Sequence, residues 1–488
     1  MTNIFETNEK ARTPKSRHDL SYSKLFTCDM GQLIPVMADE VVPGDLWKIG
    51  NDSIVRFQPM VAPVMANINQ FVHYFFVPYR LLDDKFEDFI TGGIDNEYEE
   101  PLDTWAPTNT AVGSLWDYMG FPVGRDEVEP LNFTRKAYNL IYNEYYRDQN
   151  LMDEVDLDQE LILNRLWRKD YFSSSMPWKQ RGVSPSFPIT GTLHADFTSS
   201  FDIETSGALS ISYTGDRLSA TNVERQTNSG LAMSDNVVDM SDATTFNMND
   251  LRIAVSLQRW MERNARGGVR YTEFLRSHFG VSPTDSRLQR PEYIGGSVNP
   301  VLISEVLQTS STDATSPQGT LAGHGIGISE SFIKKFKAEE YGIIIGLMSI
   351  IPDAHYQQGI NRQHLRETRY DFYFPDFANL SEQAIMGKEL CVTTDADYND
   401  GIFGYQGRYD EMRIKQNMVC GEMRDTFDYW HLGRQFDIAS PPELNSDFLV
   451  CNPSKRIFAV QNEPTIIVNF GNRIDALRPI PAAPIPDL

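Results

Sequence analysis

The feature that most constrains this chain is an apolar run, INQFVHYFFVP, at residues 68–78. Successive side chains of an extended strand point to opposite sides, so a half-buried strand alternates apolar and polar residues. This run is apolar on both sides, as in a strand that lies between two layers of protein. It therefore predicts the inside of a β-sandwich. One side carries Ile68, Val72, Tyr74 and Phe76, and the other carries Phe71, Phe75 and Val77.

Short β-type runs broken by Pro and Gly continue along the 488 residues, at residues 32–63 and again from about residue 187. Long helical and loop segments separate them. Strands spread over the whole length fit one β-sandwich at residues 25–488, decorated by its insertions, better than several independent domains. Because loops longer than about 15 residues are uncommon unless they bind a partner, this organisation favours a protein of an assembly.

Three segments are expected to depart from the sandwich. Residues 81–181 contain the clearest helix, at residues 131–150, and are expected to form a helical insertion. Residues 214–249 are rich in Ser, Thr, Asn and Asp, and are expected to form a surface excursion with little core of its own. Residues 477–488 are rich in proline and are expected to form an extended tail. The apolar stripe of the helix consists of Phe133, Ala137, Leu140, Ile141 and Tyr145.

The net charge of −23, from 44 basic and 67 acidic residues, limits how this chain can contact nucleic acid. Proteins that neutralise phosphates by themselves are usually basic. Any such contact must therefore come from local basic patches or from a separate basic partner. The longest apolar stretch, at residues 341–351, is too short to span a bilayer, and the N-terminus carries no apolar signal segment. We expect neither a membrane-spanning protein nor one secreted by a signal peptide.

A search for catalytic and metal-binding motifs gives no convincing constellation. HGIGISES, at residues 324–331, lacks the third glycine of a dinucleotide fingerprint, which favours a flexible surface turn. DADYNDG, at residues 395–401, resembles a calcium loop, but its glycine falls one position late, which favours an Asp/Asn-rich turn. The four cysteines form no CxxC pair and are expected to be buried free thiols. We therefore expect no enzyme and no cofactor.

Two basic features are candidates for contact with nucleic acid. Residues 1–24 are expected to form a mobile basic arm, which can follow phosphates without a fixed register; a purely structural arm is the alternative. A second helix, at residues 249–267, carries arginines spaced by seven, four and three residues on one face. Their alternative role is to pair with the surplus carboxylates. The candidates are Lys10, Arg12, Lys15 and Arg17 in the arm, and Arg252, Arg259, Arg263 and Arg266 in the helix.

Several long stretches carry a resemblance to a known family. They include SKLFTCDMGQLIPVMADEVVPGD at residues 23–45, AYNLIYNEYYRDQNL at residues 137–151, ARGGVRYTEFLRSHFGVSPTDSRLQRPEYIGG at residues 265–296 and YQQGINRQHLRETRYDFYFPDFANLSEQAI at residues 356–385. They resemble the major capsid proteins of the Microviridae, the small tailless single-stranded DNA bacteriophages, and in particular the gokushovirus branch. Residues 214–249 show no sequence similarity to this family.

This resemblance implies a mainly β protein, an eight-stranded antiparallel jelly roll with large helical and loop insertions, assembled into a T=1 icosahedral shell. It implies a circular single-stranded DNA genome inside that shell. The implied partners are further copies of the chain, a small basic DNA-packaging protein, a DNA pilot protein and a host cell-surface receptor. The implied location is the virion, after assembly in the cytoplasm of a host bacterium.

In the gokushovirus branch, a variable insertion forms a protrusion at the threefold axes of the shell. Residues 214–249, alone or together with the strands from Phe187, match this insertion by position and composition, so we expect them to form an outer-surface protrusion that serves in host attachment. The alternative function for the whole chain is a carbohydrate-binding or glycan-processing β-sandwich, which only the acidic and aromatic content supports. Particle size separates the two functions, because a capsid protein forms megadalton particles.

Overall fold

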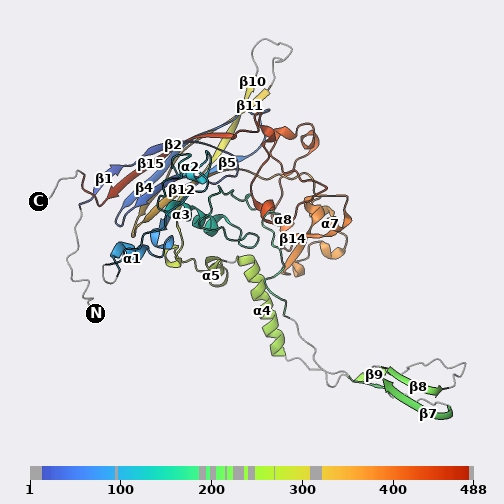
Figure 1. Cartoon of the computed structure of the whole chain (residues 1–488). Helices are drawn as coiled ribbons and strands as arrows, with labels where there is room; N and C mark the ends of the chain where they lie inside the picture. Colours follow the sequence, from blue (N-terminus) through green and yellow to red (C-terminus); the bar gives the residue numbers. More distant parts are fainter. Residues whose placement is uncertain are drawn as a thin grey trace. The chain divides into compact units, whose positions relative to one another are not determined.

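Figure 1 presents a computed structural model of the chain. The chain divides into two compact units. We term Met1–Arg181 with Arg263–Leu488 the barrel unit, and Gly182–Glu262 the insert unit, and describe each by itself. The structure describes residues 14–93, 97–185, 194–197, 205–214, 217–223, 236–239, 248–268, 270–307 and 321–482.

The described part of the barrel unit is built on nine strands in one antiparallel sheet, in the order β1-β15-β4-β11-β10-β5-β12-β3 with β2 also on β15. β1 and β2 pair with successive parts of β15, so the strands occupy eight places. The sheet curls until its two halves face each other across one core, which confirms the predicted jelly roll (Figure 1). The strands are β1 (Ser16–Asp19), β2 (Tyr22–Cys28), β3 (Ile34–Val41), β4 (Leu46–Phe57), β5 (Ile68–Pro78), β10 (Glu292–Leu307), β11 (Leu321–Lys337), β12 (Gly342–Pro352) and β15 (Ile466–Arg478).

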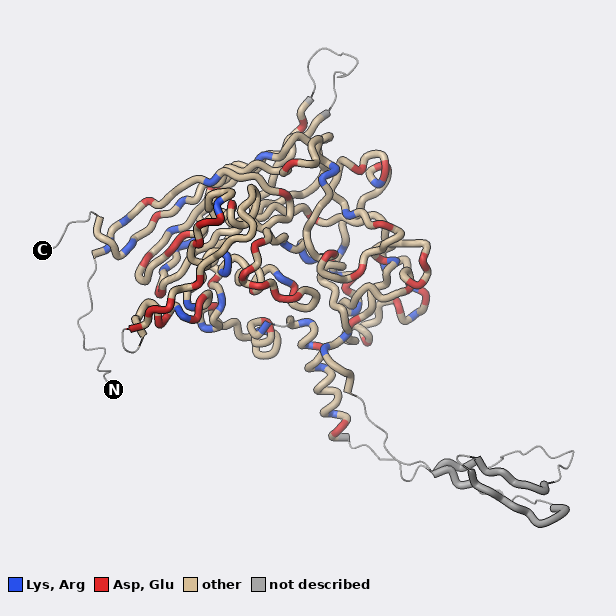
Figure 2. Tube along the Cα trace, viewed as in Figure 1, with Lys and Arg blue, Asp and Glu red and all other residues tan. Residues whose placement is uncertain are grey.

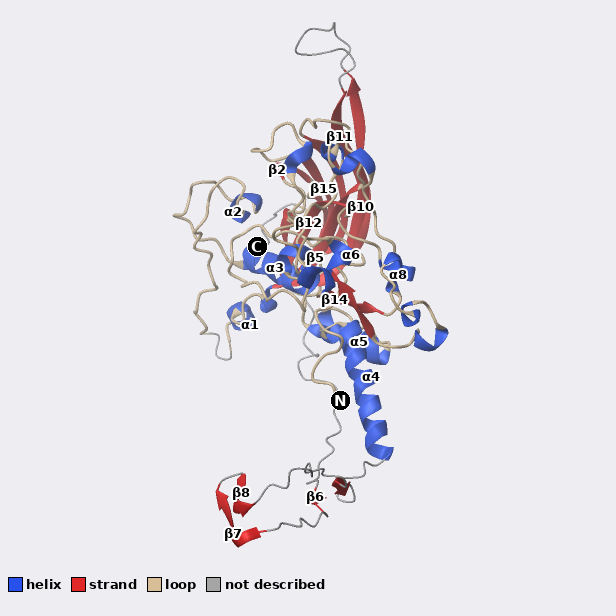
Figure 3. Cartoon of the chain, turned by 90° about the vertical axis from the view of Figure 1, so that its right-hand side faces the viewer, coloured by secondary structure: helices blue, strands red, loops and turns tan. Residues whose placement is uncertain are grey.

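Strands β5 and β12 are neighbours and are buried on both faces. One face of each strand packs into the core between the two halves of the sheet. The other face packs against helix α3 (Phe133–Ile141) in a second core, so a third layer covers this half of the sheet (Figure 3). The two-sided pattern predicted for residues 68–78 is confirmed. Ile68, Val72, Tyr74 and Phe76 lie in the first core, Phe75 and Val77 in the second, and Phe71 in a small separate cluster.

Residues 81–181 supply the third layer. Their described part contains no strand, and most of it is loop around α3. Phe133, Ala137 and Ile141 are buried in the second core, as the apolar stripe predicts, while Leu140 and Tyr145 are half-buried against it. The helices of this segment are α1 (Phe86–Thr91), α2 (Leu115–Tyr118), α3 and the π-helix η3 (Tyr142–Tyr146).

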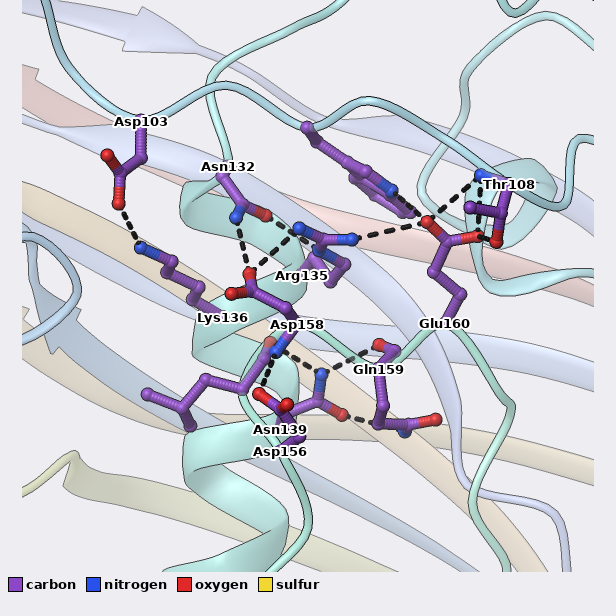
Figure 4. Close-up of polar contacts among 12 residues, drawn as sticks. Asp103, Thr108, Asn132, Arg135, Lys136, Asn139, Asp156, Asp158, Gln159 and Glu160 are labelled. Atoms are coloured by element: carbon purple, nitrogen blue, oxygen red, sulfur yellow. Dashed lines mark hydrogen bonds and ion pairs between the residues drawn. The ribbon is translucent and has the colours of Figure 1, made fainter.

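A polar network fixes these loops to α3 (Figure 4). The buried Arg135 pairs with Asp158 at 2.8 Å and with Glu160 at 3.2 Å. Glu160 also accepts hydrogen bonds from the Trp105 indole at 2.8 Å and from the Thr108 backbone N–H at 2.9 Å. Burial alone would raise the pKa of Glu160, but the hydrogen bonds from Thr108 and Trp105 hold that pKa below its usual value. The insertion is therefore ordered by buried polar contacts as well as by apolar packing.

Between β12 and β15 the barrel unit forms a lobe of short elements around a further core, which includes Phe172, Ile385, Phe403 and Phe448. β13 and β14 form an antiparallel pair in this lobe. No helix in the described residues is long and apolar enough to cross a membrane. The other α-helices and strands described in the unit are α5 (Tyr271–Phe279), β13 (Glu382–Met386), α6 (Gly387–Leu390), α7 (Ala396–Asp400), β14 (Ile402–Gly407), α8 (Asp410–Arg413) and α9 (Ser446–Leu449). The 3-10 helices are η2 (Tyr79–Leu81), η4 (Ser286–Leu288), η5 (Arg362–His364), η6 (Arg369–Asp371), η7 (Pro375–Phe377), η8 (Gly421–Arg424), η9 (Asp428–Trp430) and η10 (Lys455–Ile457).

The described residues of the insert unit form two strand pairs. β7 (Thr205–Thr214) pairs with β8 (Arg217–Val223) in a hairpin, and β6 (His194–Phe197) pairs with β9 (Asn236–Asp239). Residue 214, where the predicted excursion starts, is the last residue of β7 and pairs with Arg217 of β8. Composition changes at that point, but ladder hydrogen bonds are made by backbone groups and do not follow composition. α4 (Met248–Gly267) leads from this unit back to the barrel unit.

Two predicted boundaries near the chain ends are wrong. The predicted arm at residues 1–24 includes β1 and the start of β2, which both pair with β15. The tail is predicted to begin at residue 477, but Leu477 and Arg478 belong to β15, so the strand ends two residues after the predicted start of the tail. Pro479, which has no backbone N–H, follows the strand. Residues 1–13 and 483–488 lie outside the described residues.

Side chains close the open side of the barrel, where the edge strands β2 and β3 meet. The Lys24 ammonium donates to the Pro35 carbonyl of β3 at 2.9 Å and also to the Tyr118 carbonyl of α2. The Tyr22 hydroxyl donates to the Asp39 carboxylate at 3.0 Å. Burial lowers the pKa of Lys24 to about 8, because the charged amine is largely removed from water.

This seam predicts a pH dependence of stability that belongs to Lys24. The pKa is about 8 in the folded chain and 10.5 in an unfolded reference, so the folded amine binds its proton more weakly. The free energy of unfolding should therefore rise with pH through this window, by about 1–2 kcal/mol between pH 8 and pH 9.5. Lys24→Met removes the titration. The free energy of unfolding of free subunits, measured in urea, should rise from pH 8 to pH 9.5 by that amount more in the wild type than in Lys24→Met. If the difference between the two proteins is the same at both pH values, the pKa of Lys24 is not lowered by burial.

Candidate nucleic-acid interface

Of the four basic residues predicted to form the arm, Lys10 and Arg12 lie outside the described residues. Lys15 is exposed, and its ammonium donates to a backbone carbonyl of the turn between β3 and β4 at 2.7 Å. Arg17 lies in β1, and its guanidinium donates two hydrogen bonds to the Asp475 carboxylate of β15, at 2.5 and 2.6 Å. Both described cations are thus engaged at the edge of the sheet.

An open groove of about 780 Å³ lies beside this pair, on the outer face of the sheet. Its walls alternate in charge. Arg473 pairs with Glu330 at 2.5 Å, and Lys48 lies 3.4 Å from Asp475. The hydrogen bond from Arg17 lowers the pKa of Asp475 below its usual value. Figure 2 shows Lys and Arg mixed with Asp and Glu along the barrel strands. The groove is lined by carboxylates as well as cations and is therefore no purely basic channel.

The predicted helix at residues 249–267 is confirmed as α4, which begins one residue earlier, at Met248. Its four arginines are exposed and share one face. Arg266 pairs with Glu382 of β13, whose side chain is only 1% exposed. The predicted pairing with surplus carboxylates therefore holds for Arg266. Within the described residues no ion pair engages the other three arginines, which are Arg252, Arg259 and Arg263.

The sequence analysis missed Lys48 and Arg473 as residues of this surface. Each is a single charged residue in a strand, and the two strands are far apart along the chain. Arg473 lies 421 residues from Asp52, its second partner at 3.3 Å. The alternation of LWKIGNDSIVRF signals that Lys48 faces outward, but only the pairing of β4 with β15 shows what it faces.

The glycine-rich stretch HGIGISES belongs to strand β11, so both the phosphate-loop and the surface-turn interpretations are wrong. A Cβ on Gly325 would come within 2.9 Å of the Phe57 ring. The glycine thus allows β11 to pass close to the side chain of a neighbouring strand. Glycines are typical of turns, but in this strand a glycine is needed because a larger residue would collide with the neighbouring side chain.

The acidic turn and the cysteines can also be located. The Asp395 carboxylate accepts from the Asp397 backbone N–H at 3.0 Å and caps α7. In the described residues no group of three His, Cys, Asp or Glu side chains is placed to hold a metal ion. Cys420 is exposed because it lies in a surface loop, so the prediction of a buried thiol is wrong there. The buried free cysteines are Cys28, Cys391 and Cys451.

Comparison with known proteins places these features in a family. Residues 7–488 match the family described as "Capsid protein (F protein)". The chain is 34% identical to "Capsid protein VP1" of Chlamydia phage 1, over 100% of this chain and 98% of that protein. It is 33% identical to "Capsid protein VP1" of Bdellovibrio phage phiMH2K, over 99% and 97% of the two chains. It is 29% identical to "Capsid protein VP1" of Spiroplasma virus 4, over 97% and 95%.

The ion pair of α4 predicts different costs for two neighbouring arginines. Arg266→Ala leaves the buried Glu382 carboxylate without its cation, and should lower the free energy of unfolding by about 1–3 kcal/mol. Because half of the Arg266 side chain is exposed, the loss should stay below that of a fully buried pair. Arg263→Ala removes an arginine from the same face and should cost less than about 0.5 kcal/mol. Equal costs in denaturant unfolding would show that the pair does not stabilise the fold.

Proposed function

The chain belongs to the capsid protein (F protein) family of the Microviridae, and on that premise we propose that its copies assemble into a T=1 icosahedral shell around a circular single-stranded DNA genome. It is a capsid protein of the virion and a structural protein, not an enzyme. Family membership thus decides between the two functions that the sequence left open.

The observation that carries this proposal is the extent of the match. The three VP1 relatives align over 97–100% of this chain and over 95–98% of their own length. The jelly roll is also suited to a shell, since it is a rigid block whose long loops are free to contact neighbours.

We propose that positive charge for the genome comes mainly from a separate small basic DNA-packaging protein. A chain with a net charge of −23 repels phosphate on average, and in the described part of the barrel most cations already pair with carboxylates. Lys10, Arg12 and Lys15 would add contacts from the inside of the shell. A DNA pilot protein completes the proposed partners, and assembly takes place in the cytoplasm of the host bacterium.

We propose that the insert unit, including residues 214–249, protrudes from the outer surface and contacts a host receptor. Two observations support this role. The insert is a compact unit in its own right, and the described residues of the barrel core all belong to the barrel unit. Its sequence at residues 214–249 is rich in Ser, Thr, Asn and Asp, which suits a surface exposed to water.

The arm can be tested by neutralising Lys10, Arg12 and Lys15 together with Gln. Arg17 is left intact because it holds Asp475. Filled particles of this variant should release DNA at lower salt, while empty shells keep wild-type thermal stability. Each lost phosphate contact should lower the salt slope of DNA binding by roughly 0.7, so three should lower it by about 2.

A matched control removes the same charge from α4. The Arg252→Gln, Arg259→Gln and Arg263→Gln triple variant should leave DNA release unchanged. If both triple variants release DNA at the same salt concentration, or if neither differs from the wild type, the arm has no special role in holding the genome.

Host attachment can be tested by removing the β7–β8 hairpin. Thr205 pairs with Val223, so residues 206–222 can be replaced by a short glycine linker between ends that already lie close together. Deleting residues 214–249 would instead split the hairpin and expose an unpaired strand. The hairpin deletion should leave particle yield unchanged and lower adsorption to host cells at least tenfold. Loss of particles, or wild-type adsorption, would contradict the proposed role.

A further inference from the structure

An exposed cluster of aromatic residues lies in the lobe between β12 and β15, which also contains α7, α8 and β14 (Figure 1). We term Tyr370, Phe372, Tyr373, Phe374 and Phe377 the aromatic ridge. The first three are each 51% exposed, and Phe374 is 42% exposed. Ring centroids are 6.1 Å apart between Tyr370 and Phe377, and 5.9 Å apart between Phe374 and Phe377. The rings of Tyr370, Phe374 and Phe377 are therefore in contact, and Phe372 and Tyr373 add two further exposed rings in the same stretch of chain.

The ridge is held in place from beneath. The Tyr409 hydroxyl donates to the Phe372 carbonyl at 3.1 Å, and its ring lies 5.0 Å from that of Tyr373. Arg408 donates to the Tyr370 carbonyl at 2.9 Å. Tyr409 is buried and has a φ of +65°, a conformation that costs a residue other than glycine about 1–3 kcal/mol. Such strain persists only where the surrounding contacts fix it, so the ridge is presented on a rigid support.

The exposed area is of the size that an interface needs. Aromatic side chains bury roughly 150–250 Å² each, so the four that are about half exposed leave on the order of 300–500 Å² in water. A standard protein interface buries about 800 Å² on each partner. The ridge would thus supply about half of one side. Leaving that much aromatic surface in water is unfavourable, and covering it would be a substantial gain.

The charges around the ridge favour a protein over nucleic acid as its partner. A single-stranded nucleic-acid site combines stacking rings with a surplus of free cations. Here the exposed carboxylates of Glu367 and Asp376 lie within the same stretch of chain. The nearby guanidinium groups stack on ridge rings. Arg, Tyr and Phe are the residue types enriched at protein interfaces. Arg366, Arg369 and Arg408 lie 4.7–5.8 Å from the ring centroids of Phe372, Tyr370 and Phe377.

We propose that the aromatic ridge is a subunit contact, packed against a neighbouring copy of this chain in the shell. The inference rests on the proposed function, because a closed shell requires every chain to bury part of its surface on other copies. A second copy fits the balanced charge and the exposed area of the ridge. The rigid support also lowers the entropy lost on association.

The test replaces two exposed ridge residues in the full-length chain, Phe372→Ser with Tyr373→Ser. The fraction of protein in megadalton particles, measured by sedimentation at equal total concentration, should fall at least tenfold. The free subunit should keep the wild-type thermal transition, because both side chains are half exposed. As a control, Val112→Ser with Leu161→Ser changes side chains that are 81% and 69% exposed outside the ridge, and should assemble as the wild type does.

Assembly of the ridge variant at the wild-type concentration would overturn the subunit contact. A wild-type chain that forms no particles would instead contradict the proposed function, and this contact with it. The two failures are therefore distinguishable.

A labelling experiment separates the second copy from DNA. In a Cys420→Ser background, which removes the described exposed cysteine, Tyr373→Cys places a thiol on the ridge. A maleimide should label it in free subunits and react at least tenfold more slowly in both empty and filled particles. Equal labelling of subunits and particles would overturn the proposal. Protection in filled particles alone would assign the ridge to the genome and would overturn it as well.

Discussion

The burial of β5 and β12 on both faces is the constraint on which the rest of the barrel unit depends. Neither strand can lie at a surface, so each needs protein on both sides. The curled sheet provides one side, and α3 with its loops provides the other. Loop backbone brought into such a layer must find hydrogen-bond partners. The contacts of Arg135 and Glu160 meet part of that need, which makes the long insertion a structural layer of the fold.

The other half of the sheet has outward side chains that stay exposed in the described chain. Ile328 of β11 is 75% exposed, and Ile54 of the adjacent β4 and Ile467 of β15, the next strand in the sheet, are about half exposed. Paired charges lie beside them, including Arg17 with Asp475. The subunit therefore has one sheet face covered by its own insertion and one open face of mixed character. This open face is a surface through which a capsid protein can meet neighbours or the genome, in addition to the subunit contact that we propose for the aromatic ridge.

Local patterns predicted the parts of the fold that local sequence determines. The two-sided apolar run of β5 and the stripe of α3 are both properties of neighbouring residues, and both were predicted correctly. Ser16–Asp19 carries no apolar signal, and it becomes strand β1 only because β15, more than 450 residues away, offers a free edge. The glycines of β11 read as a turn because the Phe57 ring against which they pack is not visible in the sequence.

The candidate site was predictable to a similar extent. The arginine face of α4 follows from helical spacing, whereas the pairing of Arg266 with Glu382 depends on the fold of a distant lobe. The aromatic ridge is a dense run of rings in the sequence, DFYFPDF, but its exposure depends on the support from Tyr409. Sequence reasoning thus found residue types and periodicities, and missed the partners that strand pairing brings together.

The mass of the assembled particle tests the central claim most directly. A shell of the T=1 class built from this 55.6-kDa chain should have a protein mass of roughly 3 MDa. Native mass measurement on the purified full-length protein should give one species of that mass, with additional mass when DNA is enclosed. A monomer or a small oligomer at every concentration at which the chain is folded would contradict the account.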